Sequence, residues 1–428
     1  MSYKINKRRL QKIFNRLRKL PGGNNFFRYT WNKLYGFFLK MVKSTKVPYP
    51  SSIMLEVTNH CNLGCITCPR EYAFGQAMAK GTIDLDKMKK VIDEVGPYID
   101  SIGLTGLGET LLYKKLEEIL QYIKSKNKGI QTFISTNAHI PGAENYIERM
   151  APYLDTVQIS IDGIGKVYET VRLKSDYSFF FETTRKMVAV CKEKNVSVMF
   201  NFVAVNENYK QMKDVVKLAA ELGVGFVNIT PVNVGSITSA NVDYYNLFYS
   251  DDFKDELKQA FDASKQLGNV ELTIWDVKKR NEFKKCHLPW NHFYISWDGY
   301  MTVCCAKPFP KELNFGNVFE TSLMQCLNSK EYRQFRVMWF KNETPDYCKK
   351  CHLPWNHFYI SWDGYMTVCC AKPFPKELNF GSVFEEGLMK CLNSPGYRQF
   401  REMWYRNEAP EFCKNCHILD LDPVILEA

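Results

Sequence analysis

The chain has 428 residues, of which 45% are apolar and 24% are charged. A protein of this length and composition folds into roughly two or three domains with a substantial core, which excludes disordered and collagen-like classes. The nearest approach to a membrane-spanning run, Tyr35 to Val42, is broken by Lys40 and is too short. The start of the chain lacks the order of a secretory signal, so we predict a cytoplasmic protein.

The net charge of +11 is unevenly distributed along the chain. Residues 1–46 contain 13 Lys or Arg and no Asp or Glu, which leaves 44 of the 57 basic residues against 46 acidic ones elsewhere. The excess positive charge therefore belongs to a distinct basic, amphipathic N-terminal segment.

Apolar residues recur at helical spacing twice within this segment, before and after a break at Pro21-Gly22-Gly23. Basic faces opposite Phe, Trp and Leu suit a helix lying on anionic lipid, which would place the protein at the membrane periphery. A helix pair packed on the body of the protein is an equal alternative. Nucleic acid is not expected as a partner, because nothing downstream resembles a base-reading module. The two apolar runs are Leu10, Ile13, Phe14, Leu17 and Leu20, and Phe27, Trp31, Leu34, Tyr35, Phe38 and Val42.

Between residues 52 and 232, short β-branched runs alternate with amphipathic helices, which is typical of a parallel sheet built from βα units. Six such units predict an α/β fold with a partial, TIM-like (β/α)6 barrel over residues 47–235, and residues just after each strand are candidates for the site. The predicted strands are Ile53–Thr58, Ser101–Thr105, Ile130–Ser135, Thr156–Ile161, Ser197–Val203 and Gly225–Thr230. The predicted helices are Leu85–Val95, Tyr113–Lys126, Ala143–Met150, Phe179–Lys194 and Tyr209–Leu222.

The chain changes character after residue 235. Residues 236–285 form a predicted linker region with one helix, Asp252–Leu267, and one short strand, Glu271–Trp275. This region would connect the barrel to the cysteine-rich C-terminal part of the chain.

A tandem duplication occupies the C-terminal part. Cys286–Gly316 recurs without change as Cys351–Gly381, and the similarity continues less strictly with a 65-residue period. Two copies are fewer than a stable repeat array needs, so we predict two small cysteine-rich modules, residues 286–350 and residues 351–428 with the tail. A recent duplication and an error in assembling the sequence would both produce such identity.

Fourteen of the fifteen cysteines are crowded into two short regions, with Cys191 alone between them. In a reducing compartment, cysteines spaced two or three residues apart more often bind metal than form disulfides. Cys61, Cys65 and Cys68 follow the first predicted strand in the pattern C-x3-C-x2-C. Three thiolates can hold an iron-sulfur cube and leave its fourth iron open. Zinc completed by His60 is the alternative, although adjacent His60 and Cys61 would fit one tetrahedral ion awkwardly.

This motif after the first strand of a partial barrel resembles that of the radical S-adenosylmethionine (radical SAM) superfamily. The resemblance covers roughly residues 52–232. It implies that Cys61, Cys65 and Cys68 hold a 4Fe-4S cluster whose open iron binds the amino and carboxylate groups of S-adenosylmethionine. It also implies a reducing partner such as flavodoxin or ferredoxin.

The resemblance further implies contacts to S-adenosylmethionine from residues that follow later strands. A glycine-rich turn after the second strand would hold its amino group, and glycine lets the backbone approach closely. Arg172 would grip its carboxylate through paired hydrogen bonds. Many relatives have an aromatic residue just before the last cysteine, where this chain has Thr67, so the adenine contact is unassigned. The candidate residues are Gly106, Gly108, Glu109, Asn137, Ser160, Asp162 and Arg172.

The duplicated modules resemble the auxiliary-cluster regions of SPASM and twitch proteins. The first would bind a further 4Fe-4S cluster through Cys286, Cys304, Cys348 and Cys351, with Gly299 before Cys304. A zinc ribbon is the alternative for each module, because four thiolates suit zinc equally well.

Duplication leaves the second ligand set open, because Cys351 already belongs to the first set. Its candidates are Cys369, Cys413 and Cys416. Three arrangements are left open. The second module could complete its ligand set with Cys370 or Cys391, or one of the two modules could be incomplete. In the third arrangement, Cys286 and Cys304 would share a cluster with Cys413 and Cys416. We therefore expect one or two auxiliary clusters. The remaining cysteines are predicted to be small apolar core residues: Cys191, Cys305, Cys326, and Cys370 and Cys391 when they are not recruited.

Taken together, the resemblance implies an oxidoreductase that cleaves S-adenosylmethionine reductively and removes hydrogen from a substrate carbon. The auxiliary clusters would accept an electron, which makes the reaction a net oxidation, or would anchor the substrate. Twitch resemblance favours alcohol oxidation on a sugar or cyclitol, and SPASM resemblance favours modification of a ribosomally made peptide. Modification of a lipid or lipid-linked sugar and a non-catalytic metal-binding protein are the other hypotheses. No general base is assigned.

Overall fold

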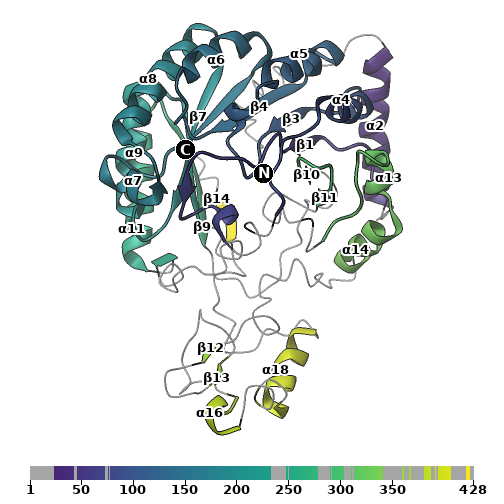
Figure 1. The fold of residues 1–428 in the computed structure, drawn as a ribbon, viewed down its shortest axis with the longest axis vertical. Coiled ribbons are helices and arrows are strands. Elements are labelled where there is room, and N and C mark those ends of the chain that lie inside the picture. Colours follow the sequence, from purple (N-terminus) through teal and green to yellow (C-terminus); the bar gives the residue numbers. More distant parts are fainter. Residues whose placement is uncertain are drawn as a thin grey trace, which may run out of the picture.

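The computed structural model describes about two thirds of the chain, and one ten-stranded sheet forms its centre. Helices cover one side of this sheet, and the strands curve inside them (Figure 1). The described residues are 24–42, 46–72, 76, 78–232, 247–248, 250–277, 290, 292–302, 310, 313–340, 359–360, 366–367, 380–386, 391, 394–405 and 421–424.

Six parallel strands form the centre of the sheet, in the order of the chain. They lie at the six predicted positions, which confirms the α/β fold with a partial barrel. They are β1 (Ser52–Leu55), β3 (Ser101–Leu104), β4 (Gln131–Thr136), β5 (Thr156–Ser160), β7 (Ser197–Ala204) and β8 (Phe226–Pro231).

Five of the six helices between these strands lie where the apolar periodicity predicts them, and two of the five have the predicted bounds, whereas the short helix α7 was not predicted. Side-chain caps fix several helix starts: Asp84 accepts a hydrogen bond from the Lys87 amide, and Asp176 accepts one from the Phe179 amide. The helices are α4 (Leu85–Val95), α5 (Leu116–Lys126), α6 (Ala143–Met150), α7 (Lys166–Val171), α8 (Tyr177–Glu193) and α9 (Met212–Leu222). Single 3-10 turns are η1 (Pro69–Glu71), η2 (Thr110–Leu112), η3 (Ala151–Tyr153) and η4 (Tyr209–Gln211).

The two faces of the sheet differ in chemistry because successive side chains alternate between them. In β5, Val157 and Ile159 are buried, whereas the alternate residues are only half-buried. The less buried face is polar: Gln158 donates to Ser135 at 3.2 Å, and Asn228 donates to Asn201 at 2.6 Å. The apolar core therefore lies under the helices, and carboxamides line the opposite face.

The sheet extends beyond the six expected strands at both edges. The predicted linker contributes α11 (Asp251–Leu267) and β9 (Glu271–Val277), and β9 pairs in parallel with β8. The C-terminal strand β14 (Leu421–Val424) then pairs antiparallel with β9. At the other edge, β10 (His292–Ile295) of the first repeat copy pairs in parallel with β1 and antiparallel with β11 (Met301–Thr302).

The repeat copies continue with helices after these hairpin strands. The first copy has α13 (Leu323–Leu327) and α14 (Lys330–Phe340). The described parts of the second copy lie apart from the barrel (Figure 1). They are the hairpin strands β12 (Tyr359–Ile360) and β13 (Met366–Thr367) and the helices α16 (Val383–Glu386) and α18 (Pro395–Tyr405).

The second apolar run of the N-terminal segment forms α2 (Asn24–Met41), which lies along the outside of the barrel near α4 and α13 (Figure 1). The first run lies outside the described residues. Among the helices that are described, none is both long and apolar enough to cross a membrane.

Candidate active site

The three cysteines of the motif lie on a loop after β1 that is held by a distant segment. This loop contains the short strand β2 (Gly64–Cys65), which pairs antiparallel with β6 (Arg172–Leu173) so that Cys65 lies opposite Arg172. The Ile66 amide adds a hydrogen bond to the Val171 carbonyl at 3.0 Å. Two candidates 107 residues apart in the sequence are therefore neighbours in a ladder.

Hydrogen-bond donors approach two of the three sulfur atoms. Asn137 Nδ2 lies 3.7 Å from Cys61 Sγ, and Arg172 Nη1 lies 3.9 Å from Cys65 Sγ. Burial raises the pKa of Cys65 to about 12 and that of Cys68 to about 11. These thiols become thiolates once cations such as the irons of a cluster stabilise the negative charge.

Among the described residues, no three His, Cys, Asp or Glu side chains converge on a point that could hold one metal ion. An iron-sulfur cube would not need such convergence, because each thiolate binds a different iron.

Arg70 and Tyr72 support the loop, and neither was predicted from the sequence. Arg70 donates to the Cys61 carbonyl at 3.4 Å and to the Leu63 carbonyl at 2.5 Å, and it forms an ion pair with Glu71. The Tyr72 hydroxyl donates to the Ile66 carbonyl at 2.5 Å. Their positions two and four residues after the last cysteine are the signal that could have identified them.

The glycine-rich turn after β3 packs against the start of the cysteine loop. A Cβ atom at Gly106 would collide with the Glu56 side chain, and one at Gly108 would collide with the Thr58 carbonyl oxygen. The amide of Glu109 donates to the His60 carbonyl at 2.8 Å. These glycines therefore let two segments of the protein meet closely, whereas the sequence suggested close approach to the ligand as the reason for them.

The carboxylate of Glu109 is satisfied within the protein. It accepts hydrogen bonds from the Asn137 amide at 2.7 Å, from the Thr136 hydroxyl at 2.7 Å and from the Leu111 amide at 3.0 Å. Burial nevertheless raises its pKa above the ordinary value. Glu109 thereby fixes Asn137, whose Nδ2 also donates to Asn62 Oδ1 at 2.8 Å.

Arg172 and Asp162 form a buried ion pair, with Nη2 2.8 Å from Oδ2. The other oxygen of Asp162 accepts from the Val203 amide at 2.8 Å. The guanidinium is thus already paired, whereas the family resemblance assigned it to the carboxylate of S-adenosylmethionine. Its Nε and the Tyr168 hydroxyl are buried and have no hydrogen-bond partner among the described atoms. Arg172 therefore keeps one unsatisfied donor beside Cys65, which fits an anionic or polar ligand.

Ser160, the remaining candidate, ends β5 opposite Asn201 of β7 and is half-buried. It belongs to the same polar face as Gln158. Its backbone position is at the edge of the sheet where the cysteine loop and the turn at Glu109 also lie, because all three follow parallel strands at the same end.

The first repeat copy contacts the same rim. A Cβ atom at Gly81 would collide with the ring of Trp297, and the Trp297 indole donates to the Ala79 carbonyl at 3.4 Å. The Thr58 hydroxyl donates to the Gly81 carbonyl at 2.9 Å. The module therefore packs on the segment around Ala79 and Gly81, which is hydrogen-bonded to Thr58 just before the cysteine loop.

Glu56 connects this module to the glycine-rich turn. Its Oε2 accepts from the Tyr294 hydroxyl at 2.5 Å and from the Leu107 amide at 2.7 Å. Burial raises the pKa of Glu56 to about 7, against the lowering effect of these hydrogen bonds. No motif pointed to Glu56, because its partners lie far away in the sequence.

Nine of the predicted metal ligands and neighbouring cysteines of the repeats lie outside the described residues, so their arrangement remains a prediction. Cys191, Cys326 and Cys391 are buried, as expected for core residues. The nine are Cys286, Cys304, Cys305, Cys348, Cys351, Cys369, Cys370, Cys413 and Cys416.

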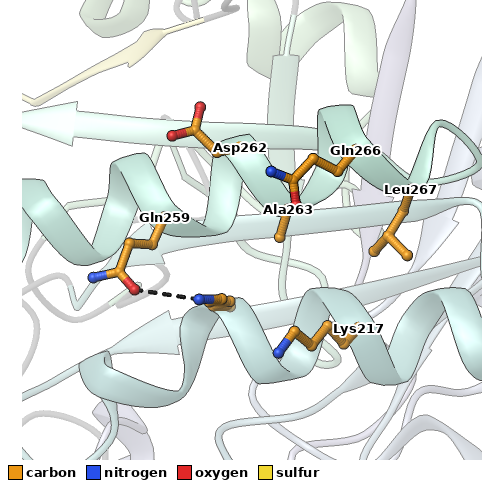
Figure 2. Close-up of a pocket in the computed structure, with 7 residues that line it drawn as sticks. Lys217, Gln259, Asp262, Ala263, Gln266 and Leu267 are labelled. Atoms are coloured by element: carbon orange, nitrogen blue, oxygen red, sulfur yellow. Dashed lines mark hydrogen bonds between the residues drawn. The ribbon is translucent and has the colours of Figure 1, made fainter.

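A surface depression of about 330 Å³ lies elsewhere, between α9 and α11 (Figure 2). Lys213 donates to Gln259 at 3.5 Å across it, and Lys217 and Asp262 also line it. Both helices lie on the outer side of the sheet (Figure 1), so this depression is not part of the cysteine site.

Comparison with known protein families agrees with the geometry. A model described as the radical SAM superfamily matches residues 55–224, and a model described as the SPASM iron-sulfur cluster-binding domain matches residues 286–352 and 351–417. The chain belongs to the radical SAM superfamily. It carries two SPASM domains, and their matches overlap at Cys351, the residue that both predicted ligand sets would need.

Curated relatives are distant but extensive. The tungsten-containing aldehyde ferredoxin oxidoreductase cofactor-modifying protein of Pyrococcus furiosus is 24% identical over 70% of this chain and 87% of its own length. The antilisterial bacteriocin subtilosin biosynthesis protein AlbA of Bacillus subtilis is 24% identical over 72% of this chain and 69% of its own. The PqqA peptide cyclase of Bradyrhizobium diazoefficiens is 23% identical over 71% and 79%, respectively.

Among solved structures, Streptococcus suis SuiB bound to precursor peptide SuiA has a similar fold. The TM-score is 0.56 with 16% identity, over 74% of this chain and 73% of that one. This similarity supports the fold. Members of the superfamily share the 4Fe-4S cluster, S-adenosylmethionine and hydrogen abstraction, and SPASM domains add auxiliary clusters.

Proposed function

We propose that this radical SAM protein modifies a peptide, using its SPASM domains to complete a net oxidation. The observation that carries the enzymatic part is the convergence of the cysteine loop, Arg172 and Asn137 at one rim of the barrel. The peptide is supported by two curated relatives, a bacteriocin biosynthesis protein and a peptide cyclase.

When bound, the cluster and S-adenosylmethionine would supply a 5′-deoxyadenosyl radical able to remove one hydrogen atom from the substrate, with one electron from a flavodoxin- or ferredoxin-class donor and methionine as the second product. Cys61, Cys65 and Cys68 would hold three irons of the cluster, and Asn137 and Arg172 would stabilise the electron-rich sulfurs. The Arg172–Asp162 pair keeps a positive charge at the rim without leaving either group isolated in the interior.

The polar face of the sheet suits a peptide ligand. The carboxamides of Gln158, Asn201 and Asn228 each carry both a donor and an acceptor, as the peptide backbone does. They are held in place by hydrogen bonds, so little side-chain entropy remains to be lost when a peptide binds. These residues would orient the reacting carbon toward the rim that carries the cysteines.

An auxiliary cluster in the SPASM domains would take up the remaining electron of the substrate radical, while a proton leaves to solvent. The substrate then loses two electrons and two protons in total, one of each as a hydrogen atom to 5′-deoxyadenosine. Tyr294 and Trp297 hold the first SPASM domain against the rim that carries the cysteine loop.

The test uses anaerobically reconstituted full-length protein with reductant and S-adenosylmethionine. We expect 5′-deoxyadenosine, and with a peptide encoded beside the gene we expect a product about two mass units lighter, the two hydrogens that the oxidation removes. Cys65→Ala should abolish both products, whereas Cys191→Ala, a buried cysteine far from the motif in sequence, should retain them. Formation of 5′-deoxyadenosine with oxidation of a sugar alcohol but of no peptide would overturn the peptide assignment alone.

A further inference from the structure

The helix α2 turns its polar side toward the barrel. The Tyr29 hydroxyl donates to Asp100 Oδ1 at 2.5 Å, and Lys33 Nζ lies 2.9 Å from Asp100 Oδ2. Asn32 is buried and exchanges two hydrogen bonds with the Tyr49 backbone, donating at 3.0 Å and accepting at 2.9 Å. Leu39 is also buried on this side. Most surface helices pack most of their apolar residues inward, so this helix has the opposite orientation.

The outward side of the same helix is densely apolar. Of the fifteen large apolar side chains that are exposed in the described part of the chain, nine lie between residues 26 and 42. The exposed fraction reaches 73% at Phe27 and 72% at Trp31. A concentration of exposed apolar side chains on one helix is typical of a binding surface. We call these nine residues the α2 face: Phe26, Phe27, Trp31, Leu34, Tyr35, Phe37, Phe38, Met41 and Val42.

The positive charge of the N-terminal segment indicates what kind of partner binds the α2 face. Residues 1–46 hold 13 basic groups and no acidic one. On α2 itself these are Arg28, Lys40 and Lys33, of which Lys33 is already paired with Asp100. Aromatic side chains with Lys and Arg on one helix match the boundary between lipid headgroups and acyl chains. A second copy of the chain would bring two basic segments together, and their repulsion disfavours a dimer through this face.

We propose that the α2 face docks the protein on an anionic phospholipid bilayer. The 18-residue helix would lie in the membrane plane, with its aromatic residues among the acyl chains and its Tyr29–Lys33 side fixed to the barrel. The basic residues of the N-terminal segment then add attraction to the anionic headgroups. This docking does not depend on the identity of the substrate.

The test is co-sedimentation of the holoprotein with phosphatidylcholine vesicles that do or do not contain phosphatidylglycerol. We expect binding to the anionic vesicles, weakened as salt is raised because exposed charges are screened. Trp31→Glu/Phe38→Glu should lower the affinity by about tenfold or more, because it removes buried apolar area and adds negative charge. The matched control is Phe226→Glu/Leu267→Glu, which replaces two exposed apolar residues outside α2 and adds the same two negative charges. This control should bind the vesicles like the wild type.

Trp31→Phe gives a second, independent signal. The wild type should show a blue shift of tryptophan fluorescence on vesicles, and this variant should bind but lose most of the shift. Equal affinity for neutral and anionic vesicles, or an unchanged affinity of the Trp31→Glu/Phe38→Glu variant, would overturn the proposal. So would a vesicle-independent dimer of the wild type that this variant dissolves, since the face would then belong to a second copy.

Discussion

Two identical 31-residue stretches meet different surroundings in this molecule. In the first copy Tyr294 pairs with Thr302, and in the second Tyr359 pairs with Thr367, which is the same hairpin register 65 residues later. The first hairpin continues the main sheet by pairing with β1, whereas the second forms a two-stranded sheet of its own.

The aromatic clusters of the two copies also correspond. Phe315 stacks on Tyr332 with ring centres 3.9 Å apart, and Phe380 stacks on Tyr397 at 4.5 Å. Each copy therefore builds its own hairpin and small core from local sequence.

Docking of the first copy depends on residues outside the repeat, which occur only once in the chain. Glu56 accepts from Tyr294, Gly81 leaves room for Trp297, and Glu94 binds backbone amides at the start of α13. A repeat thus specifies a module, but the rest of the chain specifies where one copy docks.

The largest expected effect concerns Glu56 and pH. Its pKa is about 7 in the folded protein and about 4.5 when exposed, so the folded state binds more protons between these values. The free energy of unfolding contributed by this group should therefore fall as pH rises through that window, by about 3 kcal/mol in total. Glu56→Gln should remove this slope in urea denaturation at about pH 5 and about pH 8, on either side of the window. Identical slopes for the wild type and the variant would contradict the prediction.

A smaller loss is expected at Glu94, whose oxygens accept from the Leu323 amide at 2.7 Å and the Met324 amide at 2.9 Å. Glu94→Ala should lower the free energy of unfolding by about 2 kcal/mol, because two charge-assisted hydrogen bonds are lost. Glu118→Ala removes an exposed ion pair on a neighbouring helix and should cost less than about 1 kcal/mol. The Glu94 effect should persist when the second copy is deleted; its disappearance would mean that the second copy can dock there too.

Two single-copy chains compare the repeats directly. Deleting residues 351–415 joins Cys416 to the first copy and restores its C-x2-C pair, and deleting residues 286–350 leaves the second copy directly after the β9 region. Both chains should fold. In each of them the remaining hairpin should pair with β1 as β10 does, since the hairpin residues of the two copies are identical.

The chain with the first copy should be the more stable of the two. Ser322 and Gln325 form a capping box at α13, and Asn317 Nδ2 donates to a backbone carbonyl at 2.9 Å. The second copy has Gly387 and Ser382 in place of Ser322 and Asn317. Loss of a cap and of one hydrogen bond should lower the free energy of unfolding by about 1 to 2 kcal/mol. Equal melting temperatures would show that neither contact contributes to the difference in stability.

Local sequence predicted the elements that depend on local pattern. The apolar periodicity of α4 and α6 gave their bounds, and the C-x3-C-x2-C spacing identified the cysteine loop. Pairings between distant segments were missed, because no local pattern encodes them: β9 joined the sheet, β10 paired with β1, and β2 paired with β6. The Arg172–Asp162 pair was missed for the same reason, since both residues had been assigned to the ligand.

The smallest expected effect compares the same substitution in the two copies. Tyr294→Phe removes the hydroxyl that donates to the buried Glu56, so it should lower the free energy of unfolding by about 1 kcal/mol. The cost should grow above a pH of about 7, because the carboxylate then ionises with one donor fewer. Tyr359→Phe changes the corresponding residue of the second hairpin, which pairs with β13 alone, and should cost less at every pH. Thermal melts of both variants at about pH 6 and about pH 8 measure the difference. Equal losses in the two copies would mean that the contact with Glu56 does not distinguish the docked copy from the other.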